Sequence, residues 1–292
     1  MIPSQNIVAW GNTVPWADER QVEQDLIISR AIVEIFSDPT LREALRFRGG
    51  TALNKLHFIP PLRYSEDIDL VRTSEGPIGP ILDRLRTVLE PWLGRAQFVQ
   101  SPVAPKLRFR VDAENGGGTI RLKVEINTRE ITAFDPSVNM PFQVTNPWFT
   151  GGVDVHTFSR EEILATKLRA LLQRDKGRDL YDLAHALEKF DGLDTTRVAT
   201  LFAQYLELSG MPISRAQAQE RMFAKLGNPR FILDMRPLLP APAAEALTDE
   251  STMQQFVSVF SGLIDRLPGD PWARTDEMKE RFQFPVSPHG PP

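Results

Sequence analysis

Apolar residues recur at helical spacing in two stretches of the first half of the chain. From residue 17 to 37, and again from 78 to 93, apolar positions repeat along one helical face among charged residues. This periodicity predicts two amphipathic helices. Asp38-Pro39 has the form of an N-cap followed by proline at the first helical position, which predicts a further short helix to about Arg46.

Alternation of polar and apolar residues predicts strands in the same half. The pattern runs from Lys106 to Asp112 and from Ile120 to Asn127, with Asn115-Gly-Gly-Gly118 between them as the turn of a β-hairpin. Ile68 to Val71 and Val153 to Phe158 predict two more strands. The pattern over residues 1–158 therefore predicts a mixed α/β domain with a mixed sheet.

The pattern becomes helical after residue 158. Ser159-Arg-Glu-Glu162 has the capping-box spacing that opens a helix. The expected helices cover about 159–174, 177–190, 194–208, 214–226 and 249–266. We expect a helical C-terminal domain over residues 159–284 and a disordered, proline-rich tail over 285–292.

Composition narrows the chemistry that the chain can perform. There are no cysteines and only four histidines, which excludes thiolate chemistry and favours a hard, oxygen-ligated metal such as Mg²⁺. With no run of eighteen apolar residues and no secretory pattern at the N-terminus, we expect a cytoplasmic protein without a membrane span. The net charge of −4 argues against nucleic-acid binding by bulk charge, but it leaves room for a local basic surface.

Two closely spaced carboxylates are the first candidate site. Asp67 and Asp69 are separated by one residue on an expected strand, so both point to one face and repel each other. A divalent cation would neutralise them, although a solvated strand end has the same pattern. Upstream, Gly49-Gly50-Thr51 (the glycine turn) opens a helix and offers backbone N–H groups suited to phosphate. By itself it also fits an ordinary tight turn.

Other charged residues lie in unusual positions. Glu125 shares the polar face of its strand with Arg121 and Lys123, where it could complete a two-metal carboxylate set or belong to a half-exposed strand. Lys167 lies on an apolar helix face, so it either extends to solvent or meets an anion. The next expected helix carries a polar stripe of Arg178, Asp179, Asp182 and His185, whose spacing also fits a surface salt-bridge array.

The order of glycine turn, helix, Asp-x-Asp strand, helix and hairpin resembles the polymerase-β-like nucleotidyltransferase fold, of the α+β class. More specifically, the glycine turn followed by Ala-Leu, then Arg63-x-Ser65-x-Asp67-Ile-Asp69-Leu70, is similar to the AbiEii family, which includes the MenT toxins of type IV toxin–antitoxin systems. A lysine followed one helix later by an aspartate belongs to the same pattern, which Lys167 and Asp182 match, with Asp179 as the competitor. The resemblance covers most of residues 45–190.

This resemblance implies a reaction and its partners. We expect transfer of a nucleoside monophosphate from a nucleoside triphosphate (NTP) to RNA, at the 3′ end of tRNA, and silencing by a cognate antitoxin protein. Basic residues on or beside the hairpin permit RNA binding, although an ordinary mixed-charge surface has the same pattern: Arg108, Arg110, Arg121, Lys123 and Arg129. The alternatives are a small-molecule nucleotidyltransferase of the antibiotic-modifying kind and a catalytically idle binding module.

The resemblance also implies roles for single residues. Asp67 and Asp69 would hold Mg²⁺, and Glu125 would complete a second metal site and help to deprotonate the acceptor. Gly50 and Thr51 would donate to phosphates, Lys167 would neutralise triphosphate charge and Arg63 could assist. Asp182 would orient Lys167 or an acceptor group. Ser65 would be a site of inactivating phosphorylation, or simply a hydroxyl that caps the turn.

Overall fold

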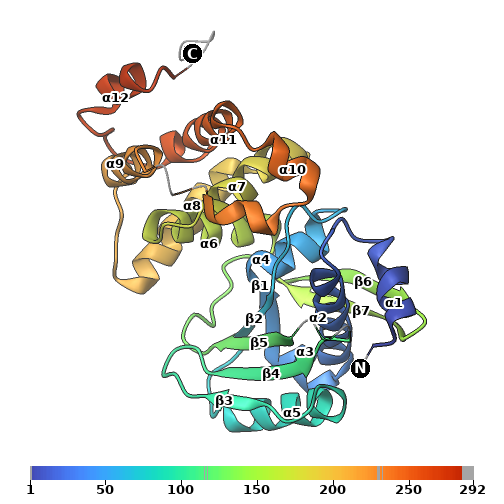
Figure 1. Cartoon of the computed structure of the whole chain (residues 1–292). Helices are drawn as coiled ribbons and strands as arrows, with labels where there is room; N and C mark the ends of the chain where they lie inside the picture. Colours follow the sequence, from blue (N-terminus) through green and yellow to red (C-terminus); the bar gives the residue numbers. More distant parts are fainter. Residues whose placement is uncertain (1, 115, 117, 229–230, 232, 285–292) are drawn as a thin grey trace. The chain divides into compact units, whose positions relative to one another are not determined.

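The computed structural model describes residues 2–114, 116, 118–228, 231 and 233–284 (Figure 1). The chain divides into two compact units, which are described separately below. The first comprises Met1–Ile163 with Leu238–Ala244, and the second comprises Leu164–Pro237 with Glu245–Pro292. The expected tail over 285–292, and residues 115 and 117 of the expected hairpin turn, lie outside the described residues.

A mixed seven-stranded sheet forms the centre of the first unit in the described part of the chain, in the order β3-β4-β5-β2-β1-β7-β6. The β2–β5 and β1–β7 pairs are parallel, and the other neighbours are antiparallel. The strands are β1 (Leu45–Arg48), β2 (Asp67–Arg72), β3 (Gln97–Val99), β4 (Lys106–Asp112), β5 (Thr119–Asn127), β6 (Val138–Asn146) and β7 (Phe149–Thr157).

Helices of the first unit pack against this sheet, and α2 makes the widest contact, reaching β2, β5, β6 and β7. The α2 helix begins after Asp18, whose carboxylate accepts from the Arg20 amide, and its apolar side is buried as the periodicity predicts. The elements of this unit are α1 (Ser4–Gly11), α2 (Glu19–Ser37), α3 (Pro39–Ala44), α4 (Gly49–Ala52), the π-helix η1 (Leu53–His57) and α5 (Gly79–Leu93).

The two faces of β2 differ in character, and this difference positions the candidate site. Ile68 and Leu70 are buried in the core, whereas Asp67 and Asp69 point to the opposite, polar face. On β5 the same alternation buries Val124 and leaves the polar residues partly exposed. One side of these strands therefore stabilises the fold, and the other is free to carry charged groups.

The second unit is helical. Phe223, Phe256 and Phe260 pack ring against ring, with centroids 5.1–6.1 Å apart, and form an aromatic centre for it. Its helices, three of which (α6, η2 and α10) begin or end in the first unit, are α6 (Arg160–Gln173), α7 (Gly177–Lys189), α8 (Thr195–Ser209), α9 (Arg215–Leu226), η2 (Leu233–Leu238), α10 (Ala241–Ala246), α11 (Asp249–Gly262), η3 (Ile264–Arg266) and α12 (Thr275–Arg281). None of the described helices combines the length and apolarity that a membrane crossing requires.

The α+β class expected from the sequence is confirmed, and Ser159 caps α6 by accepting from the Glu162 amide at 3.1 Å. The expected short helix to Arg46 ends earlier, at Ala44, because the chain turns there into β1. The sequence pattern also gave no sign of α1, β3, β6, α10 or α12. These are short elements, or, in β6, an edge strand interrupted by Pro141, so their periodicity is weak.

Candidate active site

The glycine turn packs directly against the end of β2 that carries the two aspartates. Gly49 has a φ of +81°, which favours glycine. A Cβ atom at this position would lie 3.1 Å from the Asp69 Cγ and closer still to Oδ2. Backbone conformation and space therefore both require glycine at position 49, and the turn is held against the Asp69 carboxylate.

Asp67 and Asp69 share one face of β2, as the sequence predicts. Burial is the main influence that raises the pKa of Asp69, and the charge of Asp67 raises it further. The nearby Lys123 and Arg48 charges act in the opposite direction but do not cancel these effects. A bound cation would relieve the repulsion between the two carboxylates.

Register between β2 and β5 brings the third predicted acid to the same face. Asp67 pairs with Lys123, and Asp69 pairs with Glu125. The Lys123 Nζ lies 2.9 Å from Asp67 Oδ2 and 3.1 Å from Glu125 Oε2, so this ammonium bridges the two carboxylates. The site thus contains an internal cation that the sequence did not assign to it.

Glu125 forms ion pairs with two lysines. Its Oε2 lies 3.1 Å from the Nζ of Lys106 and 3.1 Å from that of Lys123. Burial favours the neutral carboxyl, but the two ammonium groups outweigh it and lower the pKa of Glu125. Glu125 is therefore held as a carboxylate at neutral pH.

These contacts determine which of the acidic residues could hold a metal ion. Within the described residues, no three histidine, aspartate or glutamate side chains converge closely enough to hold one. The expected set of three acids is not assembled, because Glu125 faces lysines. Asp67 and Asp69 remain a two-carboxylate donor set, which is the number that Mg²⁺ commonly takes from protein when phosphate oxygens supply the rest.

Thr51 is turned inward from the glycine turn. Its side chain is buried, and its hydroxyl donates to the Asp67 carbonyl and lies 2.8 Å from the Ser65 Oγ. In this arrangement the hydroxyl links the turn to the start of β2. The sequence had suggested a phosphate donor here, and in the structure this hydroxyl is engaged within the protein.

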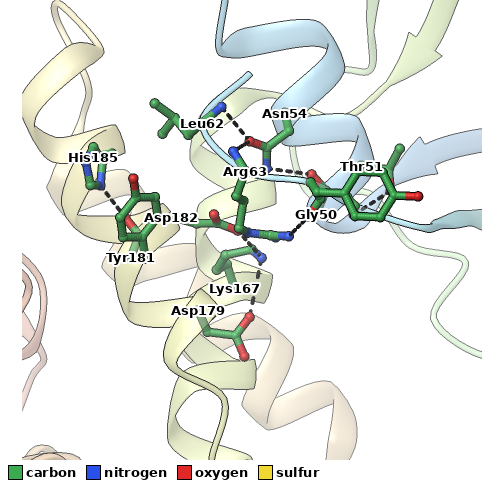
Figure 2. Close-up of polar contacts among 12 residues, drawn as sticks. Gly50, Thr51, Asn54, Leu62, Arg63, Lys167, Asp179, Tyr181, Asp182 and His185 are labelled. Atoms are coloured by element: carbon green, nitrogen blue, oxygen red, sulfur yellow. Dashed lines mark hydrogen bonds and ion pairs between the residues drawn. The ribbon is translucent and has the colours of Figure 1, made fainter. Parts of the chain in front are cut away.

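Asn54 connects the glycine turn with the segment that precedes β2 (Figure 2). Its Nδ2 donates to the Gly50 carbonyl at 3.0 Å, and its Oδ1 accepts from the amides of Leu62 and Arg63 at 3.1 and 3.2 Å. Arg63 is buried against Gly50, where a Cβ would overlap its Nη2 and lie 3.4 Å from its Cζ. Sequence reasoning missed Asn54, since a single side-chain-to-backbone link leaves no periodic signal.

The predicted residues of the second unit form a buried charge cluster, also drawn in Figure 2. Lys167 is 6% exposed, and its Nζ lies 2.7 Å from Asp182 Oδ2 and 3.3 Å from Asp179 Oδ1. Of the two readings for this lysine, contact with an anion is the one observed. Both aspartates are fully buried, so a surface salt-bridge array is excluded for them.

A second cation completes this cluster. Arg174 donates to both oxygens of Asp179, at 2.7 and 2.9 Å, so the arginine that binds Asp179 is not its sequence neighbour Arg178. Burial favours the neutral form of Asp179, but Lys167 and Arg174 outweigh it and lower its pKa. His185 lies apart from these ion pairs, with its ring on Tyr181 and its Nδ1 2.9 Å from the Tyr181 carbonyl.

A strip of cations extends from the acidic group, which consists of Asp67, Asp69 and Glu125, along the polar face of β4 and β5. Register places Arg108 opposite Lys123, and Arg110 opposite Arg121. Like charges directly opposite each other destabilise a sheet, so sheet stability does not explain Arg110 opposite Arg121, whereas Lys123 is paired with Asp67 and Glu125. We call the set Lys106, Arg108, Arg110, Arg121 and Lys123 the basic strip.

Known proteins resemble this chain in sequence family and in fold. Residues 30–257 match the family model described as nucleotidyl transferase AbiEii toxin, type IV TA system. No protein of curated function matches the chain in sequence.

Among solved structures, the nucleotidyltransferase toxin MenT4 from Mycobacterium tuberculosis H37Rv is similar, with a TM-score of 0.58 and 18% identity over 97% of this chain and 99% of MenT4. JHP933 from Helicobacter pylori is similar with a TM-score of 0.55 and 15% identity, over 91% of this chain and 96% of its own. At these identities the likeness concerns the fold.

Proposed function

The chain belongs to the AbiEii family of nucleotidyltransferase toxins of type IV toxin–antitoxin systems, and from this premise we propose that it transfers a nucleoside monophosphate from an NTP to the 3′ end of tRNA, with Mg²⁺ as cofactor. Such a modification would block translation, in the cytoplasm where tRNA acts. The observation that carries the proposal is the Asp67–Asp69 pair held against the glycine turn.

In the proposed reaction, a hydroxyl oxygen of the acceptor attacks the α-phosphorus of the NTP. The bond from this phosphorus to the bridging oxygen breaks, and pyrophosphate leaves with the electron pair. Asp67 and Asp69 would hold the Mg²⁺, which neutralises charge on the triphosphate. Gly50 and Arg63 would face the phosphates. Glu125 would help to deprotonate the hydroxyl, a role in which its lowered pKa makes it a weak base.

Lys167 and Asp182 have a supporting part in this proposal. The role of Lys167 in neutralising triphosphate charge stays a prediction from the resemblance, and within the second unit Asp182 holds this lysine through the 2.7 Å contact. Asp182 is the nearer carboxylate to the Lys167 Nζ, at 2.7 Å against 3.3 Å for Asp179. This favours Asp182 as the residue that orients the lysine.

The basic strip favours RNA as the acceptor. The repulsion between its opposed arginines, Arg110 and Arg121, would be relieved by the phosphates of a polyanion. A nucleotidyltransferase acting on cationic drugs would need acidic groups at this place instead. A catalytically idle binding module would have no use for two aspartates that repel each other beside a glycine turn.

Regulation by the cognate antitoxin could act through Ser65. Its hydroxyl contacts Thr51 at 2.8 Å, and it lies two residues before Asp67. A phosphate on Ser65 would replace that contact and add a charge of about −1.5 to −2 beside the carboxylates, where it would compete with the triphosphate. Mass spectrometry of the toxin after co-expression with its antitoxin tests this. Full silencing of the toxin with Ser65 unmodified would reject it.

The acceptor can be identified by incubating the protein with each labelled NTP, Mg²⁺ and total RNA. We expect the label in the tRNA fraction, at the 3′ end, and its loss when Mg²⁺ is chelated. Label on a small cationic molecule, with none on RNA, would favour the antibiotic-modifying alternative.

A further inference from the structure

We propose that Asn54 is a positioning residue that holds the glycine turn and the Arg63 segment in the arrangement that binds the triphosphate; this inference rests on the proposed function. Asn54 is 2% exposed and belongs to the π-helix Leu53–His57, directly after the turn. Short π-helices occur frequently at functional sites. The Asn54 side chain is bonded to three backbone groups, so it acts through the segments to which it is bonded.

Its amide group uses both ends to join two separate segments. The Nδ2 donates to the carbonyl of Gly50, and the Oδ1 accepts from the amides of both Leu62 and Arg63 (Figure 2). These bonds hold the backbone of the proposed phosphate-binding turn to the backbone of the proposed phosphate-binding arginine. A small displacement of either group would alter both, and an error of about 1 Å in such a site can cost a factor of about 100 in rate.

The sequence of the segment explains why this bond matters. Pro60 and Pro61 have no N–H group, so Leu62 supplies the first backbone donor after them, and Asn54 accepts from it. Arg63 is then fixed at its amide by Asn54 and at its guanidinium by the 3.0 Å bond from Nη1 to the Tyr64 carbonyl. Without the Asn54 side chain, the amides of Leu62 and Arg63 would lose their hydrogen-bond acceptor.

The next residue of the same π-helix is anchored independently. Lys55 Nζ lies 2.7 Å from both carboxylate oxygens of Asp25, which also accepts from the indoles of Trp10 and Trp16. This ion pair attaches η1 to α2, so the π-helix has a fixed position from which Asn54 can hold the two segments. Through Asn54, the position of the glycine turn is therefore fixed relative to η1 and α2.

Asn146 offers a matched control. It is also buried, donates through Nδ2 to a backbone carbonyl, that of Asn6, at 2.9 Å, and accepts at Oδ1 from the Trp148 amide at 2.9 Å. It lies at the end of the edge strand β6, in the same unit but outside the acidic group. Asn54→Ala and Asn146→Ala thus remove similar bonds from different places.

The test measures kcat and KM for the NTP, affinity for a non-hydrolysable NTP analogue, and amide hydrogen exchange at Leu62 and Arg63. We expect Asn54→Ala to raise KM and weaken analogue binding by about tenfold or more, with faster exchange at both amides. Asn146→Ala should leave KM and these two amides unchanged. An Asn54→Asp variant keeps the acceptor for the Leu62 and Arg63 amides but loses the donor to the Gly50 carbonyl. Exchange at the Leu62 and Arg63 amides should therefore stay slow, while KM still rises. The same variant provides the test if the alanine variant does not fold.

The possible failures can be told apart. If the wild-type protein binds the NTP analogue and Asn54→Ala binds it equally well, the positioning role is overturned while the proposed function stands. The same holds if both asparagine variants raise KM alike, since the effect is then general destabilisation. If the wild-type protein binds no NTP, the proposed function and this inference both fail.

Discussion

Gly49 and Asp69 lie so close together that a Cβ atom on the glycine would lie 3.1 Å from the Asp69 Cγ and closer to its Oδ2. The aspartate thus occupies the space that any other residue at position 49 would need. This contact, together with the bond from the Thr51 hydroxyl to the Asp67 carbonyl, joins the glycine turn to β2. The two motifs, separated in the sequence, therefore lie together in the fold.

Gly49→Ala should therefore both destabilise the protein and displace Asp69. Gly210→Ala is the control, because Gly210 also has a left-handed φ, +65°, but has open space around it. We expect the control to cost about 1 kcal/mol of unfolding free energy, and Gly49→Ala to cost about 1–3 kcal/mol more. Urea unfolding and NTP binding measure the two effects. Equal losses in both variants would show that Asp69 is not constrained by the turn.

The ion pair between Asp25 and Lys55 should contribute strongly to stability. Asp25 is buried and also accepts from two indole N–H groups, so Asp25→Ala leaves the ammonium and both indoles without this acceptor. We expect a loss of about 3–5 kcal/mol in unfolding free energy. Glu34→Gln, which removes a more exposed partner of Arg30, should cost about 0.5 kcal/mol or less. Similar losses in the two variants would contradict the burial argument.

The lowered pKa of Asp179 predicts a pH dependence of stability in the helical unit. Because Lys167 and Arg174 hold its folded pKa below the unfolded value of about 3.9, its contribution is complete above that pH and is lost as the pH falls through the folded pKa. Asp179→Asn removes the titrating group, so its unfolding free energy should fall less steeply below about pH 5 than that of the wild type. Urea unfolding followed by circular dichroism tests this. Parallel pH profiles would show that Asp179 does not titrate differently on folding.

The basic strip should affect RNA binding without supporting the fold. Arg121→Thr removes one of two opposed cations, so stability should stay constant or rise by about a few tenths of a kcal/mol. Affinity for tRNA should fall, and the slope of log affinity against log salt should decrease by about one. Lys189→Ala, at an exposed position on α7, should leave both quantities unchanged. If the arginine variant loses stability and keeps its RNA affinity, the strip is structural.

The sequence predicted those parts of the site that depend on local pattern. Strand alternation correctly separated Ile68 and Leu70 from Asp67 and Asp69, and the apolar neighbours of Lys167 correctly indicated an unusual lysine. Both inferences needed only residues close together in the chain.

What the sequence could not predict depends on contacts between distant segments. The bridging position of Lys123 follows from the register of β2 with β5, which no local pattern encodes. The register of β4 with β5 places Glu125 beside Lys106, and within the described residues the expected set of three acids does not converge. The links of Asn54 and the inward turn of Thr51 are side-chain bonds to backbone, which have no period to detect.

Transfer of label from an NTP to tRNA, by the wild type and by two aspartate variants, tests the proposed chemistry most directly. Asp69→Asn changes the carboxylate held against the glycine turn, and Asp112→Asn changes an exposed aspartate at the far end of β4. We expect the wild type and Asp112→Asn to label tRNA and to arrest growth when expressed, and Asp69→Asn to do neither. Absence of label on RNA with every NTP, or full labelling by Asp69→Asn, would contradict the proposed active site.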